Sequence, residues 1–514
     1  MQITLYSLAG DREAHDLVGR LAETCERACS SSGTLTLFDT FDWRLFRKSL
    51  ALCRRDRELG LYPLSALDSL ARQTVSGEPR FAGDIPAGDL RAATEPIVAP
   101  RALLVVAQVR ADRTRYRVLN RDRKTVLRLT VETLTAAEGP PAWLATHLWL
   151  EPVRGYSKAA KRLTRRLQEL GLHGADPKAR YSRIFAGAAR RPGDYDPKPR
   201  VRLDPGSPAG EATRAVLRSL FEVMTCNLPH ILADTDSEFL HDFRVSIRRT
   251  RVVLSQLRGV FPAGPVERFR RQFSDLGQLT GELRDLDVYL LNESGYRSLL
   301  PESLRGDIAP FFDHLRAARR RALGEVGCGL TSQRYRDLAA DWEAFLGASQ
   351  PAPADAPQAE RATEAVVGES IIRLHDKMQR ACRRILKRGD DERVHALRID
   401  GKKLRYLMEL FATLYPRREL NSFVRELRGL QDSLGSFHDL QVQESYLLGV
   451  AAELPVEDGA GRRALLAVGS LVDRLGERRR QVKAEFAGPL AAFAAPANRQ
   501  LAQRLFAPRA GITR

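Results

Sequence analysis

A basic stretch occurs twice in the C-terminal part of the chain, at an offset of 154 positions (395 − 241 = 154). The first copy reads His241-Asp-Phe-Arg244-Val-Ser-Ile-Arg248-Arg249-Thr-Arg251, and the second reads His395-Ala-Leu-Arg398-Ile-Asp-Gly-Lys402-Lys403-Leu-Arg405. Every basic position of one copy coincides with a basic position of the other, and the same offset relates Asp285 to Asp439 (439 − 285 = 154). A repeat of so long a period indicates a duplicated domain half rather than a solenoid unit.

The spacing within each copy predicts one face of an α-helix. In the first copy, the basic residues lie at positions 0, 3, 7 and 10 relative to the first: His241, Arg244, Arg248 and Arg251. At about 100° per residue, these positions fall on one narrow face of a helix. An acidic lead-in, Asp236-Ser-Glu238 or Asp390-Asp391-Glu392, precedes each copy and supports a helix N-terminus through capping and the helix dipole. We therefore expect two histidine-led helices, each with a basic stripe.

A duplicated stripe of Arg, Lys and His is suited to holding a chain of phosphates. Arg forms paired charge-assisted hydrogen bonds with phosphate, Lys adds a compact charge, and His adds charge when protonated. Charged helix faces are usually only solvated, and each His could instead bond a neighbouring carboxylate or carbonyl. Two observations argue against the interpretation that these faces are only solvated. The clustering of like charges occurs in both copies, and only Asp242 and Asp400 are acidic within the two stretches.

The charge of the whole chain points to the same class of partner. The 514 residues carry a formal net charge of +18, which implies attraction to polyanions such as nucleic acid, polyphosphate or an anionic membrane surface. Single-strand nucleic-acid binders place aromatic rings along a basic track, whereas aromatic residues are 7% of this chain and none shares the basic face. The sequence thus favours polyphosphate, and nucleic-acid binding stays an alternative.

The cysteine pattern and the hydropathy of the chain narrow the kinds of protein that it could be. The six cysteines include no Cys-x-x-Cys pair, so we expect no structural zinc, no disulfide framework and no cofactor. The N-terminus lacks the basic region and apolar run of a signal peptide, and no stretch approaches the ~20 apolar residues of a membrane span. We expect a cytoplasmic protein.

The chain changes character at about residue 185. Before it, strand-like runs closed by turns lie at residues 3–8, 35–38, 102–109, 115–119 and 126–131, and helical spacing occurs at about 12–29, 63–75 and 157–171. Beyond residue 210, helices are predicted at 210–232, 236–260, 264–292, 300–323, 331–347, 360–388, 392–415, 418–449 and 460–490. Pro- and Gly-rich segments at about 188–210 and 347–357 indicate linkers, and long helices with short links indicate bundles.

The helices after each stripe carry further basic residues. Arg271 matches Arg425 and Arg284 matches His438 at the same offset, and Arg428 follows in the second copy. A repeated Asp beside such a surface is better suited to orienting an Arg than to catalysis, so we expect that role for Asp285 and Asp439.

The histidine-led motif followed by (Arg/His)-Asp-Leu, present twice in about 300 helical residues, resembles the CHAD family, the conserved-histidine α-helical domain. The resemblance covers roughly residues 205–495. It implies two four-helix bundles related by pseudo-twofold symmetry, with a basic groove between them that binds inorganic polyphosphate and no catalysis. Association with polyphosphate granules would suit the family, although no residue encodes a destination.

Carried over position by position, the resemblance implies ten ligands: His241, Arg244, Arg248, Arg249, Arg251, His395, Arg398, Lys402, Lys403 and Arg405. To these we add five basic residues of the following helices: Arg271, Arg284, Arg425, Arg428 and His438.

The segment Leu37-Phe38-Asp39-Thr40-Phe41-Asp42-Trp43-Arg44-Leu45-Phe46-Arg47 resembles CYTH domains, the triphosphate tunnel enzymes, which often precede CHAD domains. A strand-rich region and Leu148-Trp149-Leu150-Glu151 before a Lys/Arg-rich helix agree with it. The resemblance implies an α+β domain with an antiparallel β-barrel. Arg54, Arg55, Arg113, Arg115 and Arg117 could line its tunnel or decorate its outer face.

CYTH enzymes begin with Glu-x-Glu-x-Lys, where the carboxylates hold a divalent metal, whereas this chain has Gln2, Thr4 and Tyr6 there. These side chains cannot replace two carboxylates and a cation around a hard metal ion. We therefore expect no enzyme activity and no metal site. A metal-dependent inorganic triphosphatase or thiamine triphosphatase stays the enzymatic alternative.

The predicted domain order is a CYTH-like domain at 1–187, a linker at 188–207, an all-α CHAD domain at 208–495 and a C-terminal tail at 496–514. Within the CHAD domain, the two repeats are predicted at 208–347 and 358–495.

Overall fold

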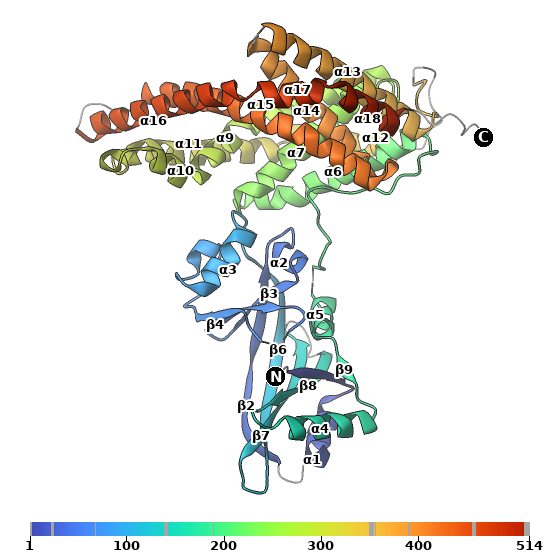
Figure 1. Cartoon of the computed structure of the whole chain (residues 1–514), viewed down its shortest axis with the longest axis vertical. Helices are drawn as coiled ribbons and strands as arrows, with labels where there is room; N and C mark the ends of the chain where they lie inside the picture. Colours follow the sequence, from blue (N-terminus) through green and yellow to red (C-terminus); the bar gives the residue numbers. More distant parts are fainter. Residues whose placement is uncertain are drawn as a thin grey trace. The chain divides into compact units, whose positions relative to one another are not determined.

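The computed structural model describes residues 3–21, 25–66, 68–137, 142–188, 190–348, 354, 356–388, 391–454 and 459–507. The chain forms two compact units, Met1–Pro197 and Lys198–Arg514, called unit 1 and unit 2 below (Figure 1). No helix within these described ranges combines the length and the apolar character needed to cross a membrane.

Unit 1 is built on one antiparallel sheet with the strand order β5-β4-β3-β2-β6-β7-β8-β1-β9. Its strands are β1 (Thr4–Leu8), β2 (Cys25–Asp39), β3 (Leu50–Arg55), β4 (Glu58–Pro63), β5 (Ala71–Thr74), β6 (Leu104–Leu119), β7 (Thr125–Ala136), β8 (Trp143–Pro152) and β9 (Gly174–Ala175). The predicted antiparallel class is confirmed. Among the described residues the hydrogen-bonded order ends at β5 and β9 rather than closing into a ring.

Five α-helices accompany this sheet in the part of unit 1 that the structure describes: α1 (Asp11–Leu21), α2 (Arg44–Arg47), α3 (Asp89–Val98), α4 (Ser157–Glu169) and α5 (Pro177–Ala186). Helix α4 packs its apolar face on the sheet, where Leu163 and Leu167 join a buried cluster with Leu148 and Leu150. Helix α5 contributes Ile184 and Phe185 to a second buried cluster.

Two helices expected in unit 1 are wrong in part or in whole. The helix expected at 12–29 ends at Leu21, because Cys25 and Cys29 belong to β2 and pair with Val118 and Arg115 of β6. Residues 63–75 form no helix in their described part and include strand β5 instead. In both places the local pattern is helical, but pairing with strands distant in the sequence decides the conformation.

The motif around Asp39 builds a turn. Its buried carboxylate accepts hydrogen bonds from the backbone N–H groups of Thr40 (2.7 Å), Leu45 (2.9 Å) and Phe46 (2.9 Å). Burial raises the pKa of Asp39 to about 6, although these bonds favour the charged form. This carboxylate thus fixes the start of α2.

An ion-pair cluster lies in the interior of unit 1. Glu132 of β7 is fully buried and accepts hydrogen bonds from Arg113 Nε (2.8 Å) and Arg180 Nε (2.7 Å). Burial alone would raise the pKa of Glu132, but the two guanidinium groups hold it well below its usual range. One buried carboxylate thereby pairs with two arginines.

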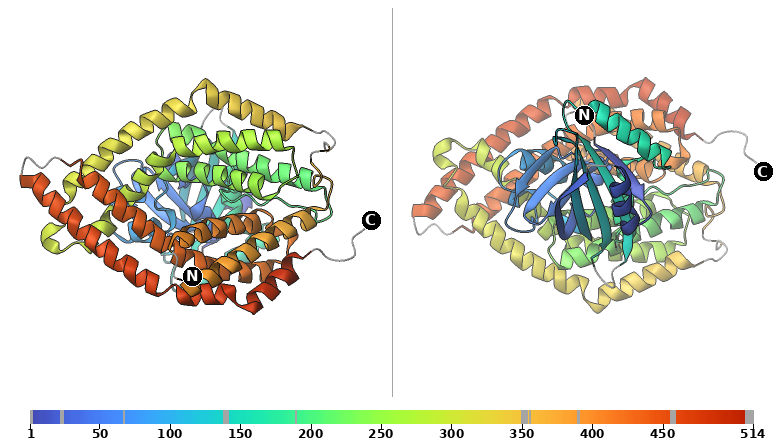
Figure 2. Two further views of the ribbon diagram at one scale, coloured as in Figure 1. Left: turned by 90° about the horizontal axis from the view of Figure 1, so that it is seen from above. Right: turned by 90° about the horizontal axis from the view of Figure 1, so that it is seen from below.

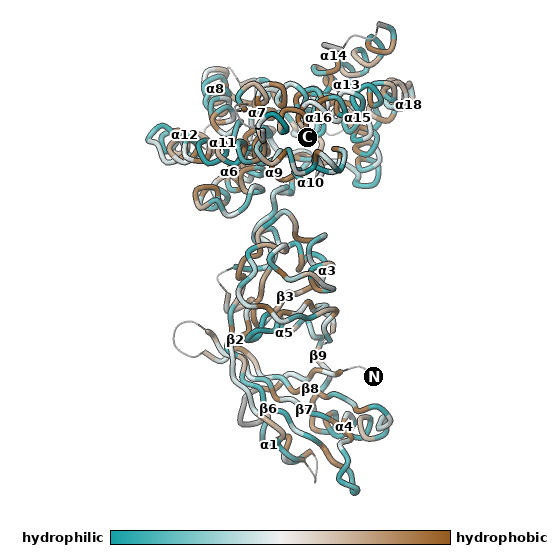
Figure 3. The backbone as a smooth tube through the Cα atoms, turned by 90° about the vertical axis from the view of Figure 1, so that its left-hand side faces the viewer, coloured by the Kyte–Doolittle hydropathy of each residue, from teal (hydrophilic) through white to brown (hydrophobic). Residues whose placement is uncertain are grey.

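Unit 2 is helical throughout its described elements. The first half contains α6 (Ala209–Leu232), α7 (Ser237–Gln256), α8 (Ala263–Leu279), α9 (Gly281–Leu291), α10 (Glu293–Leu299), α11 (Ala309–Leu330) and α12 (Gln333–Gly347). The second half contains α13 (Thr363–Arg388), α14 (Asp391–Leu410), α15 (Arg417–Ala451), α16 (Gly459–Ala484), α17 (Ala487–Ala494) and α18 (Pro496–Phe506). Figure 3 shows hydrophilic and hydrophobic residues alternating along these helices, as expected of bundles with one buried face.

The sequence offset recurs in the helix boundaries. Three successive helices of the second half begin 154 residues after their counterparts: α13 after α6 (363 − 209), α14 after α7 (391 − 237) and α15 after α8 (417 − 263). Within each half, the second of these helices packs against the first and the third. The predicted duplication is therefore also a duplication of structure.

The two halves differ where α8 gives way to α9. The single helix expected at 264–292 is wrong, because Thr280 separates α8 from α9, whereas α15 continues through the equivalent position. Arg244 Nη1 donates to the carbonyl oxygen of Gly277 and to Thr280 Oγ1, both at 2.7 Å. A side chain of α7 thus satisfies one carbonyl group and one hydroxyl group at this break.

Helix α18 lies in the segment predicted as a C-terminal tail, and it packs into the second half. Asn498 Oδ1 accepts a hydrogen bond from His375 Nε2 at 2.7 Å, and Asn498 Nδ2 donates to Glu426 Oε2 at 2.7 Å. Phe506 is buried against Tyr415, with ring centroids 4.9 Å apart. The prediction of a tail is therefore corrected for residues 496–506.

We predict that Glu132→Gln destabilises the protein by about 3–5 kcal/mol, because it leaves two arginine charges in the interior of unit 1 without a counter-charge. The wild type should also lose stability as the pH falls below the ordinary glutamate pKa of about 4.3, because the folded state holds this carboxylate ionised. Urea unfolding followed by tryptophan fluorescence measures the free energy of unfolding of the variant and its pH dependence in the wild type. Glu151→Gln, which breaks the exposed pair with Arg128, is the control and should cost under about 1 kcal/mol. Equal unfolding midpoints for the two variants would contradict the prediction.

Candidate functional site

The two histidine-led helices pack against each other. Helices α7 and α14 are in contact, and their green and orange ribbons lie next to each other in Figure 2 (left). Arg248 Nη1 donates to the hydroxyl of Tyr406 at 3.4 Å, and Arg249 Nη2 donates to Glu409 Oε2 at 3.1 Å. The contact brings the basic stripes of both copies together.

Arg249 and Glu409 form the buried part of this contact. The side chain of Arg249 is 3% exposed, and that of Glu409 is 22% exposed. Glu409 also lies 3.7 Å from Arg405 Nε and 3.5 Å from Arg428 Nη2. One carboxylate of α14 therefore gathers three of the predicted cations, and Arg249 is buried in the helix contact rather than facing solvent.

Helix α7 presents Arg244, Arg248 and Arg251 beside this contact. Arg248 and Arg251 are exposed, whereas Arg244 is half-buried. Burial, followed by the charge of Arg248, lowers the pKa of Arg244 to about 10, although Asp285 opposes the shift. The pKa of Arg251 is also lowered by burial and by nearby arginines. The stripe is therefore crowded with like charge.

Helix α14 presents Arg398 and Lys402 on the matching face. Arg398 Nη2 donates to Asp439 Oδ1 at 2.7 Å, whereas Arg398 Nε is buried and has no hydrogen-bond partner within the described ranges. Burial, followed by the charges of Arg398 and Arg248, lowers the pKa of Lys402 to about 8, with Asp439 opposing. Arg248 belongs to the other copy, so the two stripes share one electrostatic environment.

Lys402 and Lys403 have different surroundings although they are adjacent. Lys403 Nζ lies 3.2 Å from Asp400 Oδ1, and Lys377 Nζ lies 2.7 Å from the other oxygen of the same carboxylate. Lys402 has no ion-pair partner in the described part of the chain and is half-buried. Of the two adjacent amines, Lys402 is therefore the one whose charge stays unpaired in the described part of the chain.

The histidines are placed differently in the two copies. His395 and His438 approach each other in the second copy, with their Nδ1 atoms 3.3 Å apart. Burial and the charges of Arg398 and His395 lower the pKa of His438. In the first copy the equivalent of His438 is Arg284, which donates to the carbonyl oxygen of Ser237 at 3.2 Å and lies 3.7 Å from Glu238. His241 is half-buried near the start of α7.

Two of the predicted site residues show no described contact with the basic residues that α7 and α14 bring together. Arg271 is 74% exposed and lies 3.8 Å from Glu267 on its own helix. Arg425 is exposed on α15. These two residues match in the sequence, but nothing in the described contacts ties them to Arg248 or Lys402.

Sequence reasoning missed three residues of the site. Tyr289 of α9 and Tyr446 of α15 stack across the halves with centroids 4.4 Å apart, and Tyr406 accepts from Arg248. Burial and the nearby carboxylates of Asp285 and Asp439 raise the pKa of Tyr289. These tyrosines have no equivalents at the repeat offset (positions 443, 292 and 252 hold Gln, Asn and Val), so the repeat gave no signal for them.

The predicted tunnel arginines of unit 1 divide into two groups. Arg113 pairs with buried Glu132, and Arg55 Nη2 donates to the carbonyl oxygen of Ala111 at 3.1 Å. Arg54 donates to Glu78 at 2.5 Å, and Arg115 and Arg117 are exposed. Thr4 and Tyr6 lie on β1, with Tyr6 buried. Gln2 lies outside the described residues.

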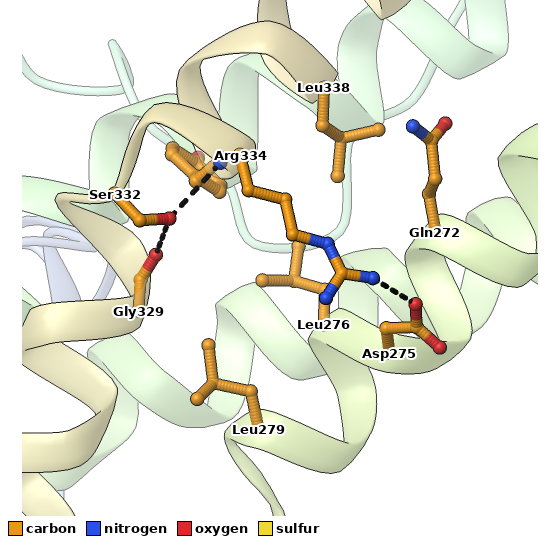
Figure 4. A pocket seen from close by; sticks show the side chains of 9 residues that line it. Gln272, Asp275, Leu276, Leu279, Gly329, Ser332, Arg334 and Leu338 are labelled. Atoms are coloured by element: carbon orange, nitrogen blue, oxygen red, sulfur yellow. Dashed lines mark hydrogen bonds and ion pairs between the residues drawn. The ribbon is translucent and has the colours of Figure 1, made fainter.

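A pocket of about 190 Å³ lies between α8, α11 and α12 (Figure 4). Leu276, Leu279 and Leu338 line it, and Arg334 pairs with Asp275 at its side. It contains none of the predicted site residues. The contact between the histidine-led helices, rather than this pocket, is the candidate functional site.

Residues 215–448 match the family model of the CHAD domain. The structure of the CHAD domain from the plant Ricinus communis is 23% identical and covers 57% of this chain and 96% of its own, with a TM-score of 0.49. PptA from Streptomyces chartreusis is 17% identical and covers 55% of this chain and 99% of its own (TM-score 0.44). HpAC1 from Hippeastrum, described as having a dominant triphosphatase activity, is 15% identical and covers 36% of this chain and 95% of its own (TM-score 0.28). No curated protein matches the chain.

We predict a coupling of about 2 kcal/mol between Arg249 and Glu409 in a double-mutant cycle of unfolding free energies, using Arg249→Met and Glu409→Gln. The reason is that the pair is largely buried between α7 and α14. The exposed pair of Arg361 and Glu369 is the control, with an expected coupling under about 1 kcal/mol. A coupling at Arg249–Glu409 no larger than this control would show that the pair does not hold the two helices together.

Proposed function

Because residues 215–448 form a CHAD domain, we propose that the protein binds inorganic polyphosphate at the cluster where α7 and α14 meet. The CHAD family is linked to polyphosphate binding, and this chain carries the chemistry that such binding needs. The proposed ligand-facing residues are Arg244, Arg248, Arg251, Arg398, Lys402 and Arg405. Association with polyphosphate granules would follow from the same binding.

One observation carries this proposal. Basic side chains from both copies lie close together, and the described carboxylates beside them are too few to neutralise their charge. Arg248 of α7 and Lys402 of α14 interact electrostatically across the copies, and burial helps to depress the pKa of Lys402. Placing like charges together at a half-buried surface costs free energy, which an anionic ligand would recover. A chain of phosphates offers closely spaced negative charge and acceptors for guanidinium forks.

The tyrosines of the site favour polyphosphate over single-stranded nucleic acid. Base stacking requires an open aromatic face, but Tyr289 is 5% exposed and its ring stacks on Tyr446. Tyr406 is 3% exposed and lies beneath the guanidinium groups of Arg249 and Arg405. These rings are occupied by neighbours within the protein, so the cluster offers charge without a stacking platform.

We also propose that the protein acts as a binder and not as a triphosphatase. Support comes from unit 1, where the first strand places Thr4 and Tyr6 at positions that a metal-dependent enzyme would fill with a carboxylate and a cation. The buried carboxylate of Glu132 is already held by Arg113 and Arg180. Phosphate release from tripolyphosphate, dependent on Mg²⁺ or Mn²⁺, would contradict this part of the proposal.

We predict that the fourfold variant Arg244→Ala, Arg248→Ala, Arg398→Ala and Lys402→Ala lowers the affinity for long-chain polyphosphate by about 100-fold or more. Each substitution removes a charge that would contact phosphate. Calorimetric titration at roughly 0.15 M salt, where exposed charges are screened beyond about 8 Å, measures the loss.

The control for this titration is the variant Arg320→Ala, Arg321→Ala, Arg384→Ala and Lys387→Ala. It removes the same numbers of Arg and Lys from exposed positions of unit 2 outside the cluster. It should keep the affinity within about threefold, since it changes only the long-range field. Equal losses in the two variants would mean that net charge, and not this site, binds the polyanion.

We predict that the affinity for polyphosphate falls about tenfold between pH 7 and pH 9. The pKa of Lys402 in the free protein is about 8, so about one amine in ten is charged a unit above it. The groups around it are Arg398 and Arg405 of its own helix, Arg248 of α7 and Asp439 of α15. The variant Lys402→Arg stays charged at pH 9 and should bind with an affinity nearly independent of pH over this range. The same pH dependence in both proteins would exclude Lys402 as its source.

A further inference from the structure

Helix α4 of unit 1 presents a second concentration of positive charge. Its basic residues recur at helical spacing and lie on one face: Lys158, Lys161, Arg162, Arg165 and Arg166. All five are exposed. Ala160, Leu163 and Leu167 form the opposite, buried face. Since the helix is about 20 Å long at 1.5 Å per residue, the five charges form a dense cationic strip.

Among the residues that the structure describes, no carboxylate pairs with these charges. None of the five side chains has a salt bridge within the described ranges, and Glu169 is the one acidic residue of α4. Exposed arginines elsewhere in unit 1 do pair with carboxylates, as Arg123 does with Glu26 at 2.7 Å and Arg128 with Glu151 at 2.8 Å. The α4 strip is therefore distinct from the ordinary paired surface of this unit.

The chemistry of the strip selects one kind of partner. Helices that bind membrane surfaces insert an apolar face into the lipid, but the apolar face of α4 is buried in its own unit, with Leu167 at 0% exposure. Nucleic-acid binders supply aromatic rings for the bases, whereas no residue of α4 is aromatic. What remains is a strip of charge suited to a flexible polyanion without bases.

We propose that the exposed face of α4 is a second binding surface for polyphosphate, used by chains long enough to engage it together with the α7–α14 cluster. This inference rests on the proposed function of that cluster. When one ligand reaches two sites of the same molecule, the second contact is intramolecular and the total affinity exceeds that of either site alone. The protein would therefore prefer long chains over short ones.

The test compares long-chain polyphosphate with tripolyphosphate in calorimetric titrations of the full chain. The variant replaces all five strip residues with glutamine: Lys158→Gln, Lys161→Gln, Arg162→Gln, Arg165→Gln and Arg166→Gln. We expect at least a tenfold loss of affinity for long chains, on the order of the avidity that linked sites give. Tripolyphosphate affinity should change by less than about twofold, and the salt dependence for long chains should become shallower, because fewer counterions are released.

A charge-matched control replaces five ion-paired arginines of unit 1, four exposed and one (Arg91) half-exposed, with glutamine: Arg72, Arg91, Arg110, Arg123 and Arg128. It should retain the wild-type preference for long chains. Circular dichroism and the unfolding midpoint confirm that both variants are folded, as expected for substitutions outside the core.

The outcomes separate the two proposals. Unchanged long-chain affinity in the α4 variant overturns this inference alone, provided that the fourfold alanine variant of Arg244, Arg248, Arg398 and Lys402 still loses affinity. Absence of polyphosphate binding by the wild type overturns the proposed function. Single-stranded DNA that displaces long-chain polyphosphate from the wild type but not from the α4 variant would assign the strip to nucleic acid and also overturn the inference.

Discussion

A largely buried ion pair between Arg249 and Glu409 links the two halves of unit 2 at the candidate site. It joins α7 of the first half to α14 of the second, at a point where both helices carry rows of like charge. Without a carboxylate here, packing these helices would bring the two sets of cations together with no compensation. Glu409 also lies near Arg405 and Arg428, so one anion offsets the repulsion while the outer charges stay open to solvent. At the repeat offset, position 255 holds Ser (409 − 154 = 255), so the repeat supplies no second copy of this carboxylate.

The positive charges at the contact of α7 and α14 that no carboxylate neutralises within the described ranges lower the stability of the folded state. Lys402 and Arg244 titrate below their ordinary values, which means that the folded state disfavours their charged forms. For Lys402, stability should therefore rise as the pH passes from about 8 towards the ordinary lysine pKa of about 10.4. Under the proposed function, an anionic ligand that binds only the folded state would offset this loss of stability by mass action.

The two units use the same residue types in opposite ways. In unit 1, Arg113 and Arg180 enclose Glu132, and the carboxylate satisfies both guanidinium groups in a fully buried setting. In unit 2, Arg248 donates to a tyrosine hydroxyl and Lys402 has no carboxylate partner within the described ranges. Burial explains the contrast, because an unpaired charge in the interior costs several kcal/mol, whereas an unpaired charge at a half-buried position costs less. Arginine content alone therefore does not identify a binding surface.

The sequence by itself determined the repeat, the helical character of unit 2 and the phase of its basic stripes, because these depend on local spacing. It also located helix starts, such as Ser237 and Asp391, to within one or two residues. Tertiary structure decided the rest. Pairing with β6 made Cys25–Cys29 a strand, and the contact of α7 with α14 buried Arg249 while leaving Arg248 exposed. Neighbouring arginines look alike in a sequence, and only the position of the opposite helix determines which one forms a structural ion pair and which one stays exposed.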